Sequence, residues 1–256
     1  MTRNLVFSAL VASPLVLATH ASHACSCVEP EPRLLSPSRS VKAPRNSSVR
    51  VVIPTHLKGK LALRKHRGRE IDARRIDSPL PNAAHVELTP VQALDADTRY
   101  EVALIRPDEH PSTLVFGTFV TANDSDTKAP TRAKIGKTTV NGHRAMAMTS
   151  CGVNTPWAEI FLSDARDPDR DDARLLYAVW ASKSPGGIDT KAPPTAYLVP
   201  RDGKIKLGRT SYCDPDDFPL PRSGTVTLAI ATIDEAGNRS PIQNVNLVIP
   251  PAGNGP

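Results

Sequence analysis

The chain has 256 residues, which is enough for two hydrophobic cores of about 100 residues each. Aromatic residues make up 4% of it, and 25 prolines stand against 14 glycines, which excludes a collagen, a flexible linker or a fully disordered chain and fits a loop-rich all-β protein. The formal net charge of +6 is spread along the sequence, so neither half is a polyelectrolyte.

Residues 1–24 carry the features of a secretory signal peptide. The basic residue Arg3 precedes an apolar stretch, and small residues come just before the cleavage point. We expect cleavage after Ala24, so that the mature chain is secreted, periplasmic or at the cell surface, with no membrane-spanning segment. Pro14 and the short apolar length argue against an uncleaved anchor. Acylation of Cys25, as in a lipoprotein, is the other alternative.

The four cysteines fit an oxidising compartment. Cys151 and Cys213 fall within one expected domain and have no metal-ligand spacing around them, so we expect a disulfide between them. In the chain-entropy model a loop of this length contributes roughly 4 kcal/mol to stability. Cys25 and Cys27 keep four alternatives: a bond to each other, reduced thiols, a lipid on Cys25, or pairing between chains.

The mature chain begins with a segment of low periodicity. Residues 25–47 are rich in Pro and Ser, which predicts an extended N-terminal spacer. Short β-branched runs separated by turn residues then predict a first β-sandwich over residues 48–124. Its expected strands cover residues 49–53, 60–63, 85–88, 100–105 and 114–121.

A polar stretch that ends near Pro130 predicts a linker at residues 125–131. A second set of strand-like runs predicts another sandwich over residues 132–250, followed by a disordered tail at 251–256. Each sandwich is expected to enclose its own core. The expected strands of the second sandwich cover residues 132–140, 144–151, 158–162, 175–181, 195–199, 204–209, 225–233 and 243–249.

Two short motifs sharpen the fold prediction. Residues 94–100 end in Tyr100 and resemble a tyrosine corner, in which the phenol hydroxyl bonds to a backbone group near residues 94–97. The run Asp234-Glu235-Ala236-Gly237-Asn238 resembles the turn between the last two strands of fibronectin type III and related Ig-like domains. The first domain is similar to the Ig-like domains of bacterial surface proteins. The resemblance implies an all-β chain of two tandem Ig-like/fibronectin III-like antiparallel β-sandwiches after a signal peptide.

The most basic stretch covers residues 58–75, with eight basic and two acidic residues. This charge predicts a site for an anionic glycan or another polyanion, and the alternative is a solvated hairpin that protects an edge strand. No aromatic residue interleaves to stack bases, so nucleic acid is not the expected ligand. The basic residues are Lys58, Lys60, Arg64, Lys65, Arg67, Arg69, Arg74 and Arg75.

A cluster of aspartates offers a candidate metal site. The spacing of Asp167, Asp169 and Asp171 resembles the start of a calcium loop. Asp172 stands where an EF-hand loop requires glycine, and neighbouring arginines neutralise the cluster. A polar loop without a metal is therefore the alternative.

The sequence contains no nucleophile elbow, metalloprotease helix motif, phosphate loop or dinucleotide fingerprint. The histidines at positions 56, 66, 85, 110 and 143 are isolated from one another and are expected at the surface. We therefore expect a noncatalytic monomer without a cofactor, a binding or spacer module that presents loops to a protein or an anionic glycan. The alternative is a hydrolase accessory protein or a protease inhibitor that acts through the basic stretch or through Cys25-Ser26-Cys27, which resembles the start of the tissue inhibitors of metalloproteinases.

Overall fold

The computed structural model of the protein describes residues 30–106, 110, 112–142, 155–170, 174–182, 187–209 and 218–251. These residues form fourteen β-strands and no helix, so the all-β prediction is confirmed. The strands pair antiparallel throughout. Within this part of the chain nothing forms a helix of the length and hydropathy that crossing a membrane requires.

The first seven strands form a sandwich of two sheets. They are β1 (Arg33–Ser36), β2 (Val49–Pro54), β3 (Lys60–Lys65), β4 (Ala73–Pro79), β5 (Ala83–Pro90), β6 (Arg99–Ile105) and β7 (Thr113–Val120). One sheet has the order β1-β2-β5-β4 and the other the order β3-β6-β7. With strands lettered along the chain, these orders are A-B-E-D and C-F-G, as in a constant-type immunoglobulin domain.

The last seven strands form a second sandwich. They are β8 (Lys134–Asn141), β9 (Trp157–Ser163), β10 (Leu176–Ser182), β11 (Ala196–Leu198), β12 (Lys204–Gly208), β13 (Gly224–Ile233) and β14 (Gln243–Ile249). Their sheets have the orders β12-β9-β8 and β11-β10-β13-β14. Here the fourth strand, β11, pairs with the third strand of its sandwich, whereas β4 pairs with the fifth. The fourth strand therefore lies on opposite sheets in the two sandwiches, and the larger sheet of the second one contains its third, sixth and seventh strands.

Alternate side chains of each strand fill two separate cores. In β2, Val49 and Val51 point into the first core, and in β13, Leu228 and Ile230 point into the second. Successive residues of a strand point to opposite faces of the sheet, so each of these strands also has a second row of side chains. Each sandwich thus encloses its own apolar interior.

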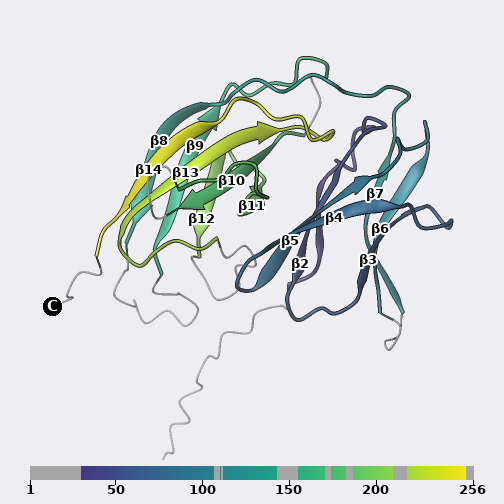
Figure 1. Ribbon diagram of the computed structural model, residues 1–256, viewed down its shortest axis with the longest axis horizontal. Helices are drawn as coiled ribbons and strands as arrows, with labels where there is room; N and C mark the ends of the chain where they lie inside the picture. The colour runs from purple at the N-terminus through teal and green to yellow at the C-terminus, as the bar shows by residue number, and fades with distance from the viewer. Residues whose placement is uncertain are drawn as a thin grey trace, which may run out of the picture.

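A third apolar layer lies between the two sandwiches. The second row of side chains on β2 and β5 includes Val52 and Ala83, which pack with Leu176 and Trp180 of β10 and with Ala231 of β13. Figure 1 shows the two sandwiches side by side, with the β2 and β5 region turned toward β10 and β11. The molecule is therefore a stack of four sheets with three buried layers, rather than two sandwiches joined only by a linker.

The predicted tyrosine corner is present. Tyr100, at the start of β6, is buried, and its hydroxyl accepts a hydrogen bond of 2.9 Å from the backbone N–H of Asp95. Its ring stacks on Phe119 of β7 at a centroid distance of 5.6 Å. The motif thus fixes the chain entering β6 to the core behind it.

The predicted turn between the last two strands is also present. Asp234 follows β13, and its Oδ1 accepts hydrogen bonds from the backbone N–H groups of Gly237 at 2.7 Å and Asn238 at 2.9 Å. Gly237 has a φ of 96°, which L side chains rarely adopt. A side chain there would also meet Arg50 of the first sandwich, since its Cβ atom would lie 3.1 Å from Arg50 Nη2. The turn is therefore shaped for contact with the other sandwich.

Two segments differ from the sequence expectations. Residues 30–47 are not a free spacer, because Arg33–Ser36 form β1 and the buried Ala43 donates a hydrogen bond of 2.8 Å to the carbonyl of Val120. The strand β4 was not predicted, because it is a mostly exposed edge strand with two arginines. The expected strand 144–151 and the tail beyond residue 251 lie outside the described residues.

Removing the hydroxyl of the tyrosine corner tests its contribution to stability. In Tyr100→Phe, the N–H of Asp95 loses its acceptor, and we expect the free energy of unfolding to fall by about 1–2 kcal/mol in urea denaturation. Tyr177→Phe is the matched control, because Tyr177 is a buried tyrosine of the second core whose hydroxyl has no hydrogen bond among the described residues. Equal losses in the two variants would argue against the corner.

Candidate functional site at the domain junction

The layer between the sandwiches contains a buried ion pair. Arg50 of β2 and Glu87 of β5 point away from the first core, and their side chains are 0% and 10% exposed. Arg50 Nη2 lies 3.0 Å from Glu87 Oε1, and Arg50 Nη1 donates to the carbonyl of Asp234, in the second sandwich, at 3.0 Å. The guanidinium group thus joins the two sandwiches through a charge that is cut off from water.

Tyr197 of β11 completes this network from the opposite side. Its hydroxyl donates to Glu87 Oε2, and its backbone N–H donates to His85 Nδ1 at 3.0 Å. The guanidinium carbon of Arg50 lies 5.2 Å from the centre of the Tyr197 ring, within cation–π range. Burial raises the pKa of Tyr197, and the negative charge of Glu87 raises it further, so the hydroxyl stays protonated and remains a donor. We call these four side chains, Arg50, His85, Glu87 and Tyr197, the junction network.

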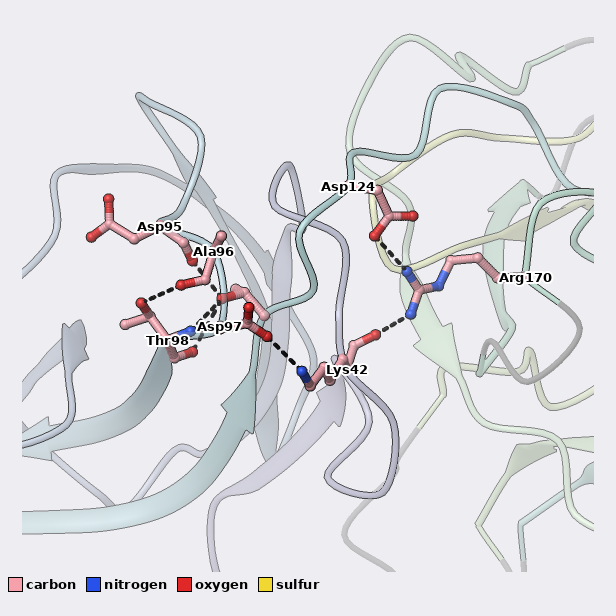
Figure 2. A network of polar contacts seen from close by, with 8 residues as sticks. Lys42, Asp95, Ala96, Asp97, Thr98, Asp124 and Arg170 are labelled. Atoms are coloured by element: carbon pink, nitrogen blue, oxygen red, sulfur yellow. Dashed lines mark hydrogen bonds and ion pairs between the residues drawn. The ribbon is translucent and has the colours of Figure 1, made fainter.

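Further polar contacts surround the junction network. The turn after β13 accepts two backbone N–H groups of the first sandwich: Ser38 donates to Glu235 Oε1 at 2.6 Å, and Ser48 donates to the carbonyl of Glu235 at 2.9 Å. Figure 2 shows Arg170 reaching from the second sandwich toward Asp124, at 3.6 Å, and toward the carbonyl of Lys42. The contacts between the sandwiches therefore extend beyond the apolar layer.

Three buried aspartates lie beside this turn and come from three segments. Asp126 belongs to the linker, Asp167 to the loop after β9 and Asp234 to the turn after β13, and one carboxylate oxygen from each lies within 4.8 Å of the others. All three residues are at most 4% exposed. We call them the aspartate cluster. Carboxylate oxygens in this arrangement could hold a divalent cation.

Electrostatics in the aspartate cluster disfavour three negative charges. Burial raises the pKa of Asp126 to about 6, with further contributions from the negative charges of Asp234 and Asp167. Burial also raises the pKa of Asp234, against the lowering effect of its hydrogen bonds from Asn238 and Gly237. None of the three makes an ion pair with a cation among the described residues.

Of the residues in the predicted calcium loop, the described part of the chain places only Asp167 in the aspartate cluster. Asp167 belongs to the aspartate cluster, whereas Asp169 is exposed and pairs with Lys128 at 2.6 Å. Asp171 lies outside the described residues. In the structure, Asp167 therefore lies beside Asp126 and Asp234 and not beside the aspartates that follow it in the sequence. Asp126 and Asp234 are distant in the sequence and were not predicted.

The structure divides the basic stretch. Four of its residues are paired with carboxylates: Lys60 with Glu70, Arg64 with Glu101, Lys65 with Asp95 and Arg75 with Asp77. The other four, which make no ion pair with a described residue, are Lys58, Arg67, Arg69 and Arg74.

Of these four, Arg67 and Arg69 lie between β3 and β4, and Arg74 lies in β4, at the edge of the other sheet. Lys58 precedes β3 and is therefore separated from Arg67 and Arg69 by the length of that strand, about 20 Å for six residues. Arg67, Arg69 and Arg74 are all exposed, and the polyanion site stays a prediction.

The remaining site predictions have mixed outcomes. Cys25, Cys27, Cys151 and Cys213 lie outside the described residues, so their pairing stays a prediction. His85 was expected at the surface, but it is 1% exposed and belongs to the junction network. In β5, His85 alternates with apolar residues that face the first core, which is the pattern of a solvent-facing residue, and its burial results from the cover of the second sandwich.

No protein-family model and no curated protein matches the sequence. Among solved structures, the fibronectin(III)-like modules of Clostridium thermocellum CbhA are similar at 11% identity and a TM-score of 0.28, over 88% of this chain and 96% of that one. The FN1–FN3 domains of chicken CNTN1 are similar at 12% identity and a TM-score of 0.23, over 86% and 65%. The titin A168169 structure is similar at 14% identity and a TM-score of 0.23, over 86% of this chain and 98% of that one. At these TM-scores the likeness carries no argument about this chain.

Breaking the buried ion pair is expected to destabilise the protein. Glu87→Gln leaves the charge of Arg50 buried without its counter-ion, and we expect the free energy of unfolding to fall by about 3 kcal/mol in chemical denaturation. Glu70→Gln, which breaks the exposed pair with Lys60, is the control and should cost under about 0.5 kcal/mol. The double variant Arg50→Met/Glu87→Leu should recover most of the loss, because it removes both charges. If Glu87→Gln costs no more than Glu70→Gln, the pair is not buried in solution.

The contribution of Glu87 should also depend on pH. Burial alone would raise its pKa, but the charge of Arg50 and the hydroxyl of Tyr197 outweigh burial and hold the pKa below the ordinary 4.5. The stabilising contribution is therefore fully present above pH 4.5 and is lost as the pH falls through the lower folded-state pKa. We expect the difference in unfolding free energy between the wild-type chain and Glu87→Gln to shrink from about pH 7 to about pH 3. A difference that does not change over this range would contradict the assignment.

Proposed function

We propose that this chain is a noncatalytic, exported binding module whose two sandwiches act as one rigid body. Export is supported by the signal-peptide features of residues 1–24. The binding role is supported by the packing of the two sandwiches against each other, because loops held on a rigid scaffold commonly carry the binding residues.

The packing of the two sandwiches through their sheets is the single observation that carries this proposal. A spacer gains reach when its domains are joined end to end, whereas these two lie side by side and bury a face of each (Figure 1). The buried pair between Arg50 and Glu87 adds an orientation requirement, because a shift of the sandwiches would break contacts that water cannot replace. A compact platform therefore fits the chain better than an extended spacer.

The ligand class that fits the surface is an anionic glycan. Arg67, Arg69 and Arg74 are exposed and make no ion pair with a described residue. Guanidinium groups bind sulfate and carboxylate groups in bidentate fashion, which suits such a ligand. The other ligand class, a protein, would not require the same salt sensitivity.

Chromatography on immobilised heparin tests the ligand class. We expect the chain to be retained and to elute with rising salt, and Arg67→Gln/Arg69→Gln/Arg74→Gln to elute at clearly lower salt. The matched control is Arg132→Gln/Lys137→Gln/Lys191→Gln, which removes three exposed cations from the second sandwich and should elute close to the wild-type chain. Equal losses in both variants would mean that retention follows net charge alone, and no retention of the wild-type chain would exclude an anionic glycan of this kind.

Small-angle X-ray scattering tests the rigid platform. We expect one compact particle for the wild-type chain and an increased maximum dimension for Glu87→Gln, because the junction network then holds an uncompensated charge. Glu70→Gln should scatter like the wild-type chain. A wild-type profile that requires an ensemble of domain orientations would contradict the platform.

A further inference from the structure

Two carboxylates of the aspartate cluster each have one oxygen that accepts a hydrogen bond and one oxygen without a donor. In Asp126 and Asp167, Oδ1 accepts a backbone N–H two residues ahead, from Lys128 at 3.1 Å and from Asp169 at 3.0 Å. The Oδ2 atom of each of these two carboxylates is buried and has no hydrogen-bond donor among the described residues. Local turn geometry thus fixes one oxygen of each carboxylate and leaves the other buried without a donor among the described residues.

A bound cation would stabilise these buried carboxylates. A buried carboxylate oxygen without a donor is costly, and three carboxylates in one small volume repel one another. The two oxygens without donors lie on residues that are 2% and 4% exposed, so bulk water does not solvate them. A bound cation would satisfy both oxygens and compensate the repulsion at once.

We infer that Asp126, Asp167 and Asp234 bind a calcium ion that fastens the interdomain linker to the second sandwich. The donors are carboxylate oxygens, with no nitrogen or sulfur among them, which selects a hard cation. Calcium accepts six to eight oxygens in flexible geometry, whereas magnesium usually keeps several of its waters. A cluster this deeply buried therefore suits calcium better than magnesium.

The position of the ion explains what it does for the fold. The backbone of Asp126 is held by Asn46 of the first sandwich, whose Oδ1 accepts the N–H of Asp126 at 2.9 Å and whose Nδ2 donates to the carbonyl of Asp126 at 2.5 Å. Asn238, in the turn after β13, donates to the same carbonyl at 3.3 Å and to Asp234 Oδ2 at 2.9 Å. The linker residue that would bind calcium is thus already bonded to both sandwiches. Calcium binding links the loop after β9 to the same point, so that it stabilises the junction as a whole.

Calcium titration of the full chain tests this inference. After dialysis against EDTA, we expect addition of CaCl2 to give a single binding event in calorimetry and to raise the thermal unfolding midpoint as its concentration rises. MgCl2 at the same concentrations should give a clearly smaller shift. No shift with CaCl2, or an equal shift with MgCl2, would overturn the assignment.

Two single substitutions locate the ion. Asp167→Asn should lose the calcium-dependent shift, and in EDTA its unfolding midpoint should equal or exceed that of the wild-type chain, because one of three repelling charges is gone. Asp169→Asn is the matched control two residues away, since Asp169 is exposed and bonded to Lys128, and it should keep the shift. Retention of the shift in Asp167→Asn, its loss in Asp169→Asn, or a lower midpoint of Asp167→Asn in EDTA would each overturn the site.

Discussion

The burial of Arg50 between two sheets is the constraint on which the rest of the architecture depends. A guanidinium group with no access to water needs a counter-ion and hydrogen-bond acceptors in fixed positions. Glu87, in the same sheet, is the counter-ion, and the carbonyl of Asp234, in the second sandwich, is one of the hydrogen-bond acceptors. The relative position of the two sandwiches is therefore set by directional polar contacts, while the apolar side chains around them supply most of the association free energy.

The sequence predicts the strands well because most of them obey a single physical rule. Alternation of apolar side chains, as in β14, indicates one buried face, and turn residues mark the strand ends. The rule fails for β1, which is only four residues long, and for β4, an edge strand of the sequence Ala-Arg-Arg-Ile-Asp-Ser-Pro. Their positions are decided by pairing with β2 and β5, which is tertiary information.

The candidate sites were harder to predict because their residues meet only in the folded chain. Asp167 could be singled out from its local spacing, but Asp126 belongs to a segment with the composition of a solvated linker. Arg50 alternates with valines and so has the pattern of a solvent-facing residue. The available signal was the continuous apolar run of β10, Leu-Tyr-Ala-Val-Trp-Ala, which indicates a strand buried on both faces and hence a partner sheet.

The order in which the two domains fold bears on the polar side chains of the junction network. Domains generally fold as units. When the first sandwich folds before the second, β10 and β13 do not yet cover the outer face of β2 and β5. Arg50, His85 and Glu87 make that uncovered face hydrophilic. Valines in all of those positions would make it an exposed apolar patch that favours aggregation. The same face is thus hydrated before the second sandwich folds and buried afterwards.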